Sequence, residues 1–259
     1  MSSETGLVTT SQDQGILQIG IQRPEKLNAL TLAMYDAMTA ALESAEEEDQ
    51  IRVILLHGTE NCFTSGNDLR DFARNPPAGE NSPVFRFLRA ISQVKKPLIA
   101  MVSGPAVGIG TTLLLHCDLV YADETARFQL PFVNLGLCPE AASSYLLPKL
   151  VGHLQASEIL LLGEMIDVER AVQLGLVNRS FSPSDLLEQV MAKAAHLAAQ
   201  PPASVRLTKS LLKESQAHQV AEVMRKEGEL FLRQLANPEA QEAINAFIEG
   251  RKADFLQFS

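Results

Sequence analysis

The fold is best read from the segment Lys96-Pro-Leu-Ile-Ala-Met-Val-Ser-Gly-Pro-Ala-Val-Gly-Ile-Gly-Thr-Thr-Leu-Leu-Leu-His-Cys-Asp118. Its residues 98–102 are all apolar, which is the pattern of a buried strand, and a glycine turn and a helix-compatible run follow. A strand, a turn and a helix start aim free backbone N–H groups at one point. Gly108 and Gly110 allow the backbone to approach a ligand closely. The segment is not a dinucleotide fingerprint, because it lacks the third glycine and the later acidic residue.

The segment Phe128–Gly152 contains one acidic side chain, Glu140. It follows a turn pair, Gly136 and Pro139, and precedes a helix-like run at 141–150. A lone carboxylate at a turn between apolar stretches suits a general base. It also suits the first turn of the helix, where it interacts favourably with the helix dipole, and this segment alone favours that interpretation. Both interpretations stay open on this segment alone.

A third segment, Asn61–Phe72, follows a short apolar strand at 53–56 and a polar turn. Its residues Ser65-Gly66-Asn67-Asp68 have the chemistry of a turn with a helix cap. Taken alone, this pattern predicts an ordinary connection from a strand to a helix.

Together, the three segments resemble the crotonase family, also called the enoyl-CoA hydratase/isomerase family. The resemblance rests on Ser-Gly-Asn-Asp-Leu at 65–69, Ser-Gly-Pro-Ala-Val-Gly-Ile-Gly at 103–110, and Pro-Phe-x-x-Leu-Gly at 131–136 followed by Glu140. Arg-Pro-Glu-Lys-Leu-Asn-Ala-Leu at 23–30 agrees with it, and it runs from about Ile16 onward. It implies an α/β fold, a crotonase-like spiral of ββα units.

The resemblance also implies two regions and an assembly. Residues 1–200 are expected to form the spiral core with the acyl-CoA site, and residues 201–259 an all-helical oligomerisation region. The implied assembly is a homotrimer or a dimer of trimers.

The site implied by the resemblance is a backbone oxyanion hole for an acyl-CoA thioester, made by the N–H groups of Asn67 and Ile109. Preorganised donors stabilise the enolate that forms when a proton next to a thioester is removed. No cofactor is expected, since coenzyme A enters as part of the substrate. The expected substrate-binding residues, with the first two as candidates for phosphate or adenine contacts, are Arg23, Lys26, Ser65, Gly66, Asp68, Leu69 and Gly108.

Two departures from the family pattern bear on the reaction. Hydratases of this family activate water with two glutamates, at positions held here by Thr112 and Phe132. The acid stands instead at Glu140, where hydratases typically carry glycine. This pattern resembles the 3-enoyl-CoA to trans-2-enoyl-CoA isomerases, in which one carboxylate moves the proton from C2 to C4. The apolar residues Phe132, Leu135 and Leu137 are expected to raise its pKa by desolvation.

Other functions stay open. One class is a different acyl-CoA enzyme of the same fold: a thioester hydrolase, a dehalogenase, a ring-forming isomerase or a weak hydratase. The other class is a non-catalytic acyl-CoA-binding or scaffolding protein, because the hydratase pair is lost. Retention of Glu140 and of both glycine turns argues against the second class.

Composition adds limits. The net charge of −9 over 259 residues argues against nucleic acid as a partner, and no apolar run has the length of a membrane span. Residues 1–14 show no export signal, residues 257–259 are no peroxisomal address, and three cysteines suit a reducing compartment, so a cytoplasmic location is expected. Cys138 is expected to pack rather than react. The five histidines show no metal-ligand spacing, so no metal site is expected.

Local patterns predict several elements. Residues 16–21 alternate as a half-buried strand, and Thr31 suits the N-cap of a helix at 32–47. The proline-rich segment 75–83 is expected to be a mobile loop that borders the acyl pocket. No strand is expected after Gly152. Helices are expected instead, at 157–165, 168–174, 184–199, 203–214 and 239–249.

Overall fold

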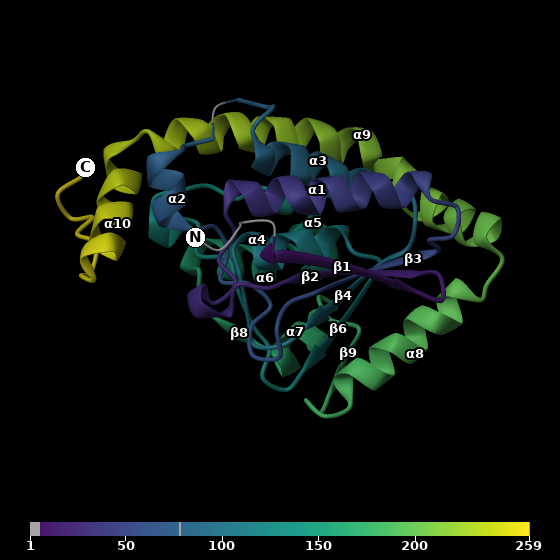
Figure 1. Ribbon diagram of the computed structural model, residues 1–259. Coiled ribbons are helices and arrows are strands. Elements are labelled where there is room, and N and C mark those ends of the chain that lie inside the picture. The colour runs from purple at the N-terminus through teal and green to yellow at the C-terminus, as the bar shows by residue number, and fades with distance from the viewer. Residues whose placement is uncertain (1–5, 78, 259) are drawn as a thin grey trace.

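Six strands form the main sheet, in the order β1-β2-β3-β4-β6-β9 (Figure 1). The computed structural model describes residues 6–77 and 79–258. β1 runs antiparallel to β2, and every later pair in this sheet is parallel. The strands are β1 (Val8–Asp13), β2 (Ile16–Ile21), β3 (Val53–His57), β4 (Leu98–Val102), β6 (Leu119–Asp123) and β9 (Arg179–Phe181).

A second, three-stranded sheet consists of β5 (Pro105–Val107), β7 (Arg127–Gln129) and β8 (Ile166–Asp167). β5 follows β4, and β7 follows β6, so consecutive strands enter different sheets. The turn between β4 and β5 requires Gly104, which has a φ of +61° and whose Cβ would lie 2.0 Å from the carbonyl oxygen of Asn61. The strand pairs, each followed by helical structure, confirm the expected spiral of ββα units.

Helices cover both faces of the main sheet (Figure 1). In β3, Val53 and Leu55 pack in the cluster that includes α8, whereas Ile54 and Leu56 pack in the cluster that includes α1 and α3. The alternation leaves four of the five residues of β3 buried, as is typical of parallel sheets with both faces covered. The α-helices are α1 (Leu32–Glu47), α2 (Leu69–Arg74), α3 (Pro83–Gln93), α4 (Ile109–Thr112), α5 (Ser143–Val151), α6 (His153–Leu162), α7 (Val168–Gln173), α8 (Leu186–Ala198), α9 (Pro202–Leu235) and α10 (Pro238–Glu249), and the 3-10 helices are η2 (Pro24–Lys26), η3 (Leu113–His116) and η4 (Val133–Leu135).

Several local predictions are confirmed. The expected strands at 16–21 and 98–102 are β2 and β4, but β2 is not half-buried as expected: five of its six residues are buried, because helices cover both faces of the sheet. The Thr31 side chain caps α1 by accepting a hydrogen bond from the amide of Met34. The C-terminal region is helical, and α9 contributes Met224, Phe231 and Leu235 to the main core.

Other predictions were wrong. Strands do occur after Gly152, but β8 and β9 have only two and three residues, too few to show a period of two. β1 was missed because it is a polar edge strand with five of its six residues exposed. The helix expected at 203–214 continues to Leu235, since no glycine or proline interrupts it before Gly228, which α9 accommodates.

Some predictions concern segments that include residues the structure does not describe. These are the absence of an export signal, which includes residues 1–5, the peroxisomal address, which includes residue 259, and the loop 75–83, which includes residue 78. Across the described ranges 6–77 and 79–258, none of the helices combines the length and apolar character needed to cross a bilayer.

Candidate active site

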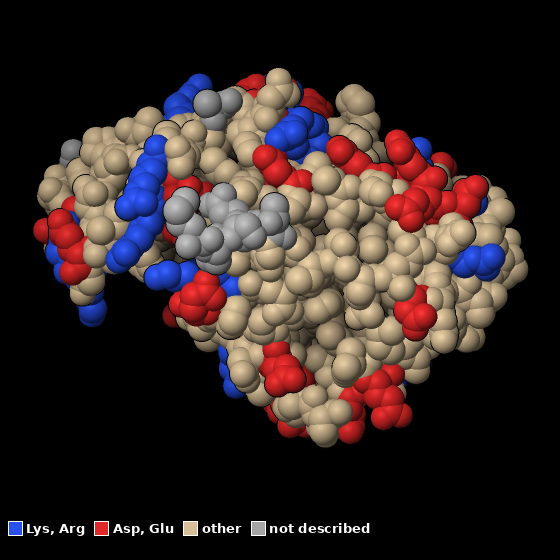
Figure 2. Space-filling view, viewed as in Figure 1, with Lys and Arg blue, Asp and Glu red and all other residues tan. Residues whose placement is uncertain are grey.

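A cavity of about 560 Å³ lies between the 65–70 turn, the start of α4, η4 and α10. These elements lie toward one end of the molecule, at the left of Figure 1. On the face shown in Figure 2, several basic side chains lie toward that end, whereas acidic side chains are found at both ends and along the lower edge, with a group at the upper right over the C-terminal part of α1. Lys26 and Arg70 are the basic residues that line the cavity. The acidic residues Glu25 and Asp68 line it as well, so the cavity combines a mostly apolar interior with two basic and two acidic side chains.

Two glycine turns bring the amides of Asn67 and Ile109 to this cavity. Each amide follows a glycine with positive φ, +91° at Gly66 and +57° at Gly108. The turns touch, since a Cβ on Gly66 would lie 2.8 Å from the carbonyl oxygen of Val107. Neither amide donates a hydrogen bond to another residue in the described part of the chain. Two free donors beside one cavity form an arrangement that can hold an oxyanion.

The side chain of Asn67 is held from α1. The hydroxyl of Tyr35 donates a hydrogen bond to Asn67 Oδ1. Tyr35 is fully buried and packs against Phe87 of α3, with ring centroids 5.4 Å apart. Burial raises the pKa of Tyr35, and the nearby charge of Glu140 adds to this effect. Tyr35 therefore contacts Asn67 and is close enough to Glu140 for the carboxylate charge to act on it.

Glu140 is a buried carboxyl group, only 6% exposed. The hydroxyl of Thr112 donates a hydrogen bond to its Oε1. Burial raises the pKa of Glu140 to about 8, against the lowering effect of that hydrogen bond, and the charge of Glu227 raises it further. The carboxyl group does not itself line the cavity, but Thr112 lies one helical turn after the cavity residue Ile109. Glu140 is therefore immediately behind the cavity wall.

The helix-start interpretation of Glu140 was wrong. α5 begins at Ser143, and its N-cap is Ala142. Ala141 and Ala142 both adopt left-handed backbone conformations, with φ of 60° and 56°, so the chain turns sharply after Glu140 instead of entering a helix. Sequence reasoning missed this turn, because neither alanine has the glycine or asparagine chemistry that signals a left-handed residue.

The turn after Glu140 is held by distant groups. His116 Nε2 lies 2.8 Å from the carbonyl oxygen of Ala141, to which it donates. Burial lowers the pKa of His116 to about 4, so the ring is neutral at physiological pH. Glu227 of α9 accepts hydrogen bonds from the amides of Ala142 and Ser144, at 2.6 and 2.9 Å. No local sequence pattern signals either partner.

The wall of the cavity near Glu140 is apolar. Phe132, Leu135 and Leu137 all line it, so these residues do face the site. Thr112 and Phe132, the positions of the two hydratase glutamates, are both buried. Cys138 lies nearby as a thiol, because burial raises its pKa to about 11.

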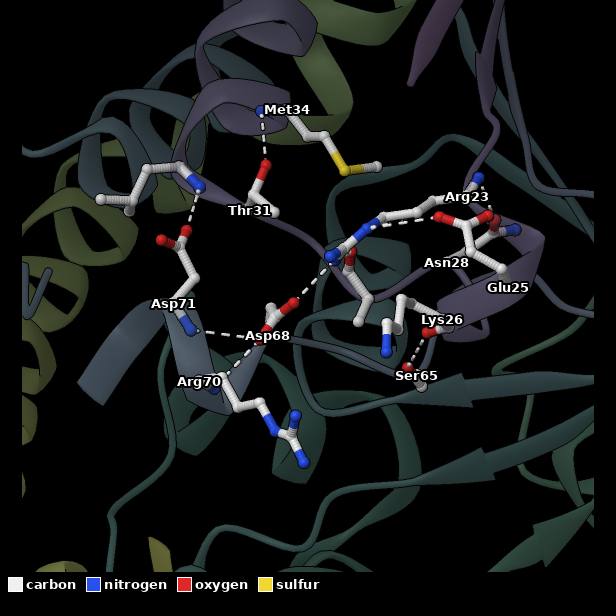
Figure 3. Close-up of polar contacts among 12 residues, drawn as sticks. Arg23, Glu25, Lys26, Asn28, Thr31, Met34, Ser65, Asp68, Arg70 and Asp71 are labelled. Carbon is white, nitrogen blue, oxygen red and sulfur yellow. Dashed lines mark hydrogen bonds and ion pairs between the residues drawn. The ribbon is translucent and has the colours of Figure 1, made fainter. Parts of the chain in front are cut away.

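The guanidinium group of Arg23 is engaged within the protein, so it is not free to bind a phosphate group. Its guanidinium pairs with Asp68 at 2.7 Å and donates to the carbonyl oxygen of Ala29 at 2.9 Å (Figure 3). Asp68 in turn caps α2 through two backbone amides. Burial tends to raise the pKa of Asp68, but the hydrogen bonds from Arg23 and from those amides lower it overall. Arg23 does not line the cavity, and its contacts join the 23–30 segment to the 65–68 turn.

The remaining expected binding residues, Lys26, Ser65, Gly66, Asp68, Leu69 and Gly108, all line the cavity. Ser65 and Lys26 are neighbours, since the Ser65 hydroxyl lies 3.5 Å from the Lys26 carbonyl oxygen (Figure 3). Lys26 is thus the stronger candidate for a phosphate contact. Within the described residues there is no group of three or more His, Cys, Asp or Glu side chains that suits a metal ion, and the absence of a metal stays a prediction.

The sequence is similar to those of known proteins. The sequence profile of the Enoyl-CoA hydratase/isomerase family matches residues 11–257. Enoyl-CoA delta isomerase 2 from Homo sapiens is 35% identical over 249 residues, covering 93% of this chain and 63% of that protein. The chain thus spans less than two thirds of the length of that relative. The 2,3-dehydroadipyl-CoA hydratase from Escherichia coli is also 35% identical, covering 95% of this chain and 96% of that protein.

Solved structures show the same fold. OdaA from Pseudomonas aeruginosa superposes with a TM-score of 0.92 at 44% identity, covering 95% of this chain and 99% of that one. An enoyl-CoA hydratase/isomerase from Pseudoalteromonas atlantica T6c superposes with a TM-score of 0.91 at 41% identity, covering 96% and 99%.

Proposed function

The chain belongs to the enoyl-CoA hydratase/isomerase family, and from that membership we propose that it converts 3-enoyl-CoA thioesters to trans-2-enoyl-CoA. The observation that carries this proposal is the buried carboxyl group of Glu140 behind the apolar wall of the cavity. Glu140 has a pKa of about 8, and the two positions that activate water in hydratases hold Thr112 and Phe132. One acid–base group suits a reaction that removes and returns a proton on the same substrate.

In the proposed reaction the thioester oxygen accepts hydrogen bonds from the amides of Asn67 and Ile109. Glu140 takes a proton from C2, and the electron pair of that C–H bond spreads into a dienolate. The same carboxylic acid then delivers the proton to C4, which leaves a double bond between C2 and C3 and regenerates the carboxylate. Because the Glu140 carboxyl group does not itself line the cavity, it must come closer to the substrate on binding, and catalytic contacts commonly tighten only then.

The raised pKa of Glu140 supports this role. A carboxylate with a pKa of about 8 is a stronger base than an exposed glutamate, and at neutral pH about a tenth of it is ionised. The Thr112 hydroxyl donates to it and therefore stabilises the ionised form. The apolar wall excludes water, which favours return of the proton to the substrate.

Assembly and location are part of the proposal. Large apolar side chains of α6 and the start of α9 are exposed, which suits burial in a homotrimer or a dimer of trimers; they include Leu154, Leu161, Leu162, Leu207 and Leu211. The three cysteines are free thiols, in keeping with a cytoplasmic location. Coenzyme A is proposed to enter only with the substrate.

Three spectroscopic assays on the purified protein test the reaction. A 3-enoyl-CoA should gain the absorbance of a conjugated thioester, crotonyl-CoA should be hydrated far more slowly, and no free thiol should be released. Hydration as fast as isomerisation would identify a hydratase and refute the proposal. Thiol release would identify a hydrolase instead.

A further inference from the structure

Glu227 is a buried acid that the proposed reaction does not use. It lies on α9 with 6% exposure, and it forms no ion pair within the described residues. Its two oxygens instead accept the amides of Ala142 and Ser144. Burying a carboxylate costs free energy unless hydrogen bonds compensate for the lost hydration. A buried glutamate at this position therefore indicates a specific role.

The two amides belong to the turn that follows Glu140. Ala141 and Ala142 both have left-handed backbone conformations, which are strained for residues other than glycine. Such a pair persists only where the surroundings determine it. Ala142 is the N-cap of α5 but has no side chain to cap the helix, and the acceptor comes from Glu227 on another helix. The direction of the Glu140 side chain therefore depends on α9.

Glu227 also acts on Glu140 through its charge. Burial raises the pKa of Glu227, while its hydrogen bonds with Ser144 and Ala142 favour the ionised form. Its negative charge in turn raises the pKa of Glu140. The other polar or titratable groups packed around Glu140 and its turn are the hydroxyl of Thr112, the phenol of Tyr35, the neutral ring of His116 and the thiol of Cys138.

We propose that Glu227 is a positioning residue for Glu140: its two amide hydrogen bonds fix the left-handed turn that aims the catalytic carboxyl group, and they place a negative charge beside that group. This inference rests on the proposed function of Glu140. If Glu227 has this role, α9 contributes to acid–base catalysis indirectly, through the position of Glu140 and without contact with the substrate.

The test compares Glu227→Gln with Glu229→Gln, which removes the same charge from an exposed residue two positions along α9. The pH dependence of kcat/KM reports the free enzyme's essential base. In Glu227→Gln, the low-pH limb should move to lower pH, because a charge that opposes ionisation of Glu140 is gone. Its limiting kcat should fall roughly tenfold to a hundredfold, because one of the two amides loses its acceptor and the carboxyl group is misplaced. Glu229→Gln should change neither.

Glu227→Asp separates charge from geometry. It keeps the negative charge on a shorter side chain, so its pH limb should stay near that of the wild type while kcat falls. A fall in kcat for Glu227→Gln with no movement of the pH limb would leave Glu227 as a helix cap and overturn the inference. Unchanged kinetics would overturn it as well. If Glu227→Gln does not fold, as judged by circular dichroism, the Asp variant decides: wild-type kcat would refute the positioning role.

A second measurement does not depend on activity. The titration of the Glu140 carboxyl group can be followed by infrared difference spectroscopy, with Glu140→Gln to assign the band. Its pKa should fall in Glu227→Gln and stay unchanged in Glu229→Gln. A wild-type protein without isomerase activity would refute the proposed function, whereas an unmoved Glu140 titration would refute the role of Glu227.

Discussion

At the scale of single residues, the site depends on a carboxyl group whose ionisation is set by its surroundings. Burial raises the pKa of Glu140, and the hydroxyl of Thr112 opposes that rise. Because the hydrogen bond favours the charged form, Thr112 tunes the base without contacting the reacting carbons. The residue that replaces a hydratase glutamate thus has a role of its own.

Thr112→Val is expected to raise the pKa of Glu140 above about 8, since the donor to the carboxylate is lost. The low-pH limb of kcat/KM should move to higher pH, and activity at pH 7 should fall. Thr112→Ser keeps the hydroxyl and should resemble the wild type. A pH profile that is identical in all three proteins would show that the hydroxyl does not tune the base.

Glu140→Gln is expected to stabilise the fold in a pH-dependent way. The folded pKa of about 8 lies above the usual value of 4.5, so between these values the native state holds a proton that the unfolded chain releases. Wild-type stability should therefore fall as pH rises from about 4.5 to 8, and then level off. The glutamine side chain of the variant does not titrate, so the Tm advantage of the variant should grow over that window. A constant Tm difference from pH 5 to 9 would contradict the raised pKa.

Sequence reasoning singled out three residues that the structure brings to one cavity, and it missed the residues that contact them. Asn67, Ile109 and Glu140 follow recognisable turns, and the first two line the cavity, with Glu140 directly behind it. Tyr35 and Glu227 are ordinary helix positions in the sequence, and their importance comes from contacts with residues far along the chain. Such contacts leave no local pattern.

At the scale of elements, two glycine turns determine where the oxyanion amides lie. The buried strands β2 and β4 were predictable, because apolar runs and alternation define them. β8 and β9 were not, since strands of two or three residues depend on pairing partners supplied by the rest of the fold. The left-handed turn before α5 was hidden for a similar reason.

Gly66→Ala and Gly108→Ala separate steric contact from backbone strain. Both residues have positive φ, but a Cβ at Gly66 would lie 2.8 Å from the Val107 carbonyl oxygen, whereas at Gly108 nothing lies within 4 Å. Both variants should lose activity, with Gly66→Ala losing more, because it also pushes the two turns apart. Steady-state kinetics with thermal unfolding checks this. An equal loss in both variants would mean that contact between the turns does not matter.

At the scale of the whole molecule, the C-terminal helices α9 and α10 contribute residues to the candidate site and also carry exposed apolar side chains. α9 supplies Glu227 to the turn after Glu140, and the cavity is closed by Phe231 and Leu235 of α9 and by Ile244 and Phe247 of α10. The same helical region leaves large apolar side chains exposed. We therefore expect assembly and activity to be linked.

Leu161→Glu with Leu162→Glu is expected to weaken the proposed trimer, because both leucines are more than half exposed on α6 and would bury charge at an interface. Sedimentation velocity should show the wild type as a trimer or hexamer and the double variant shifted toward monomer. The exposed pair Glu229→Gln with Arg225→Gln on α9 is the control. A wild-type monomer would contradict the proposed assembly.

The most direct test of the account measures turnover and binding on Glu140→Gln with a 3-enoyl-CoA substrate. The glutamine keeps the shape of the side chain but cannot accept the C2 proton. Turnover should fall by about 10²–10⁴-fold, the range associated with general acid–base catalysis. Affinity for the thioester should change little, because the amides of Asn67 and Ile109 are unaltered. A variant with near wild-type turnover would show that another group moves the proton, and would contradict the central claim.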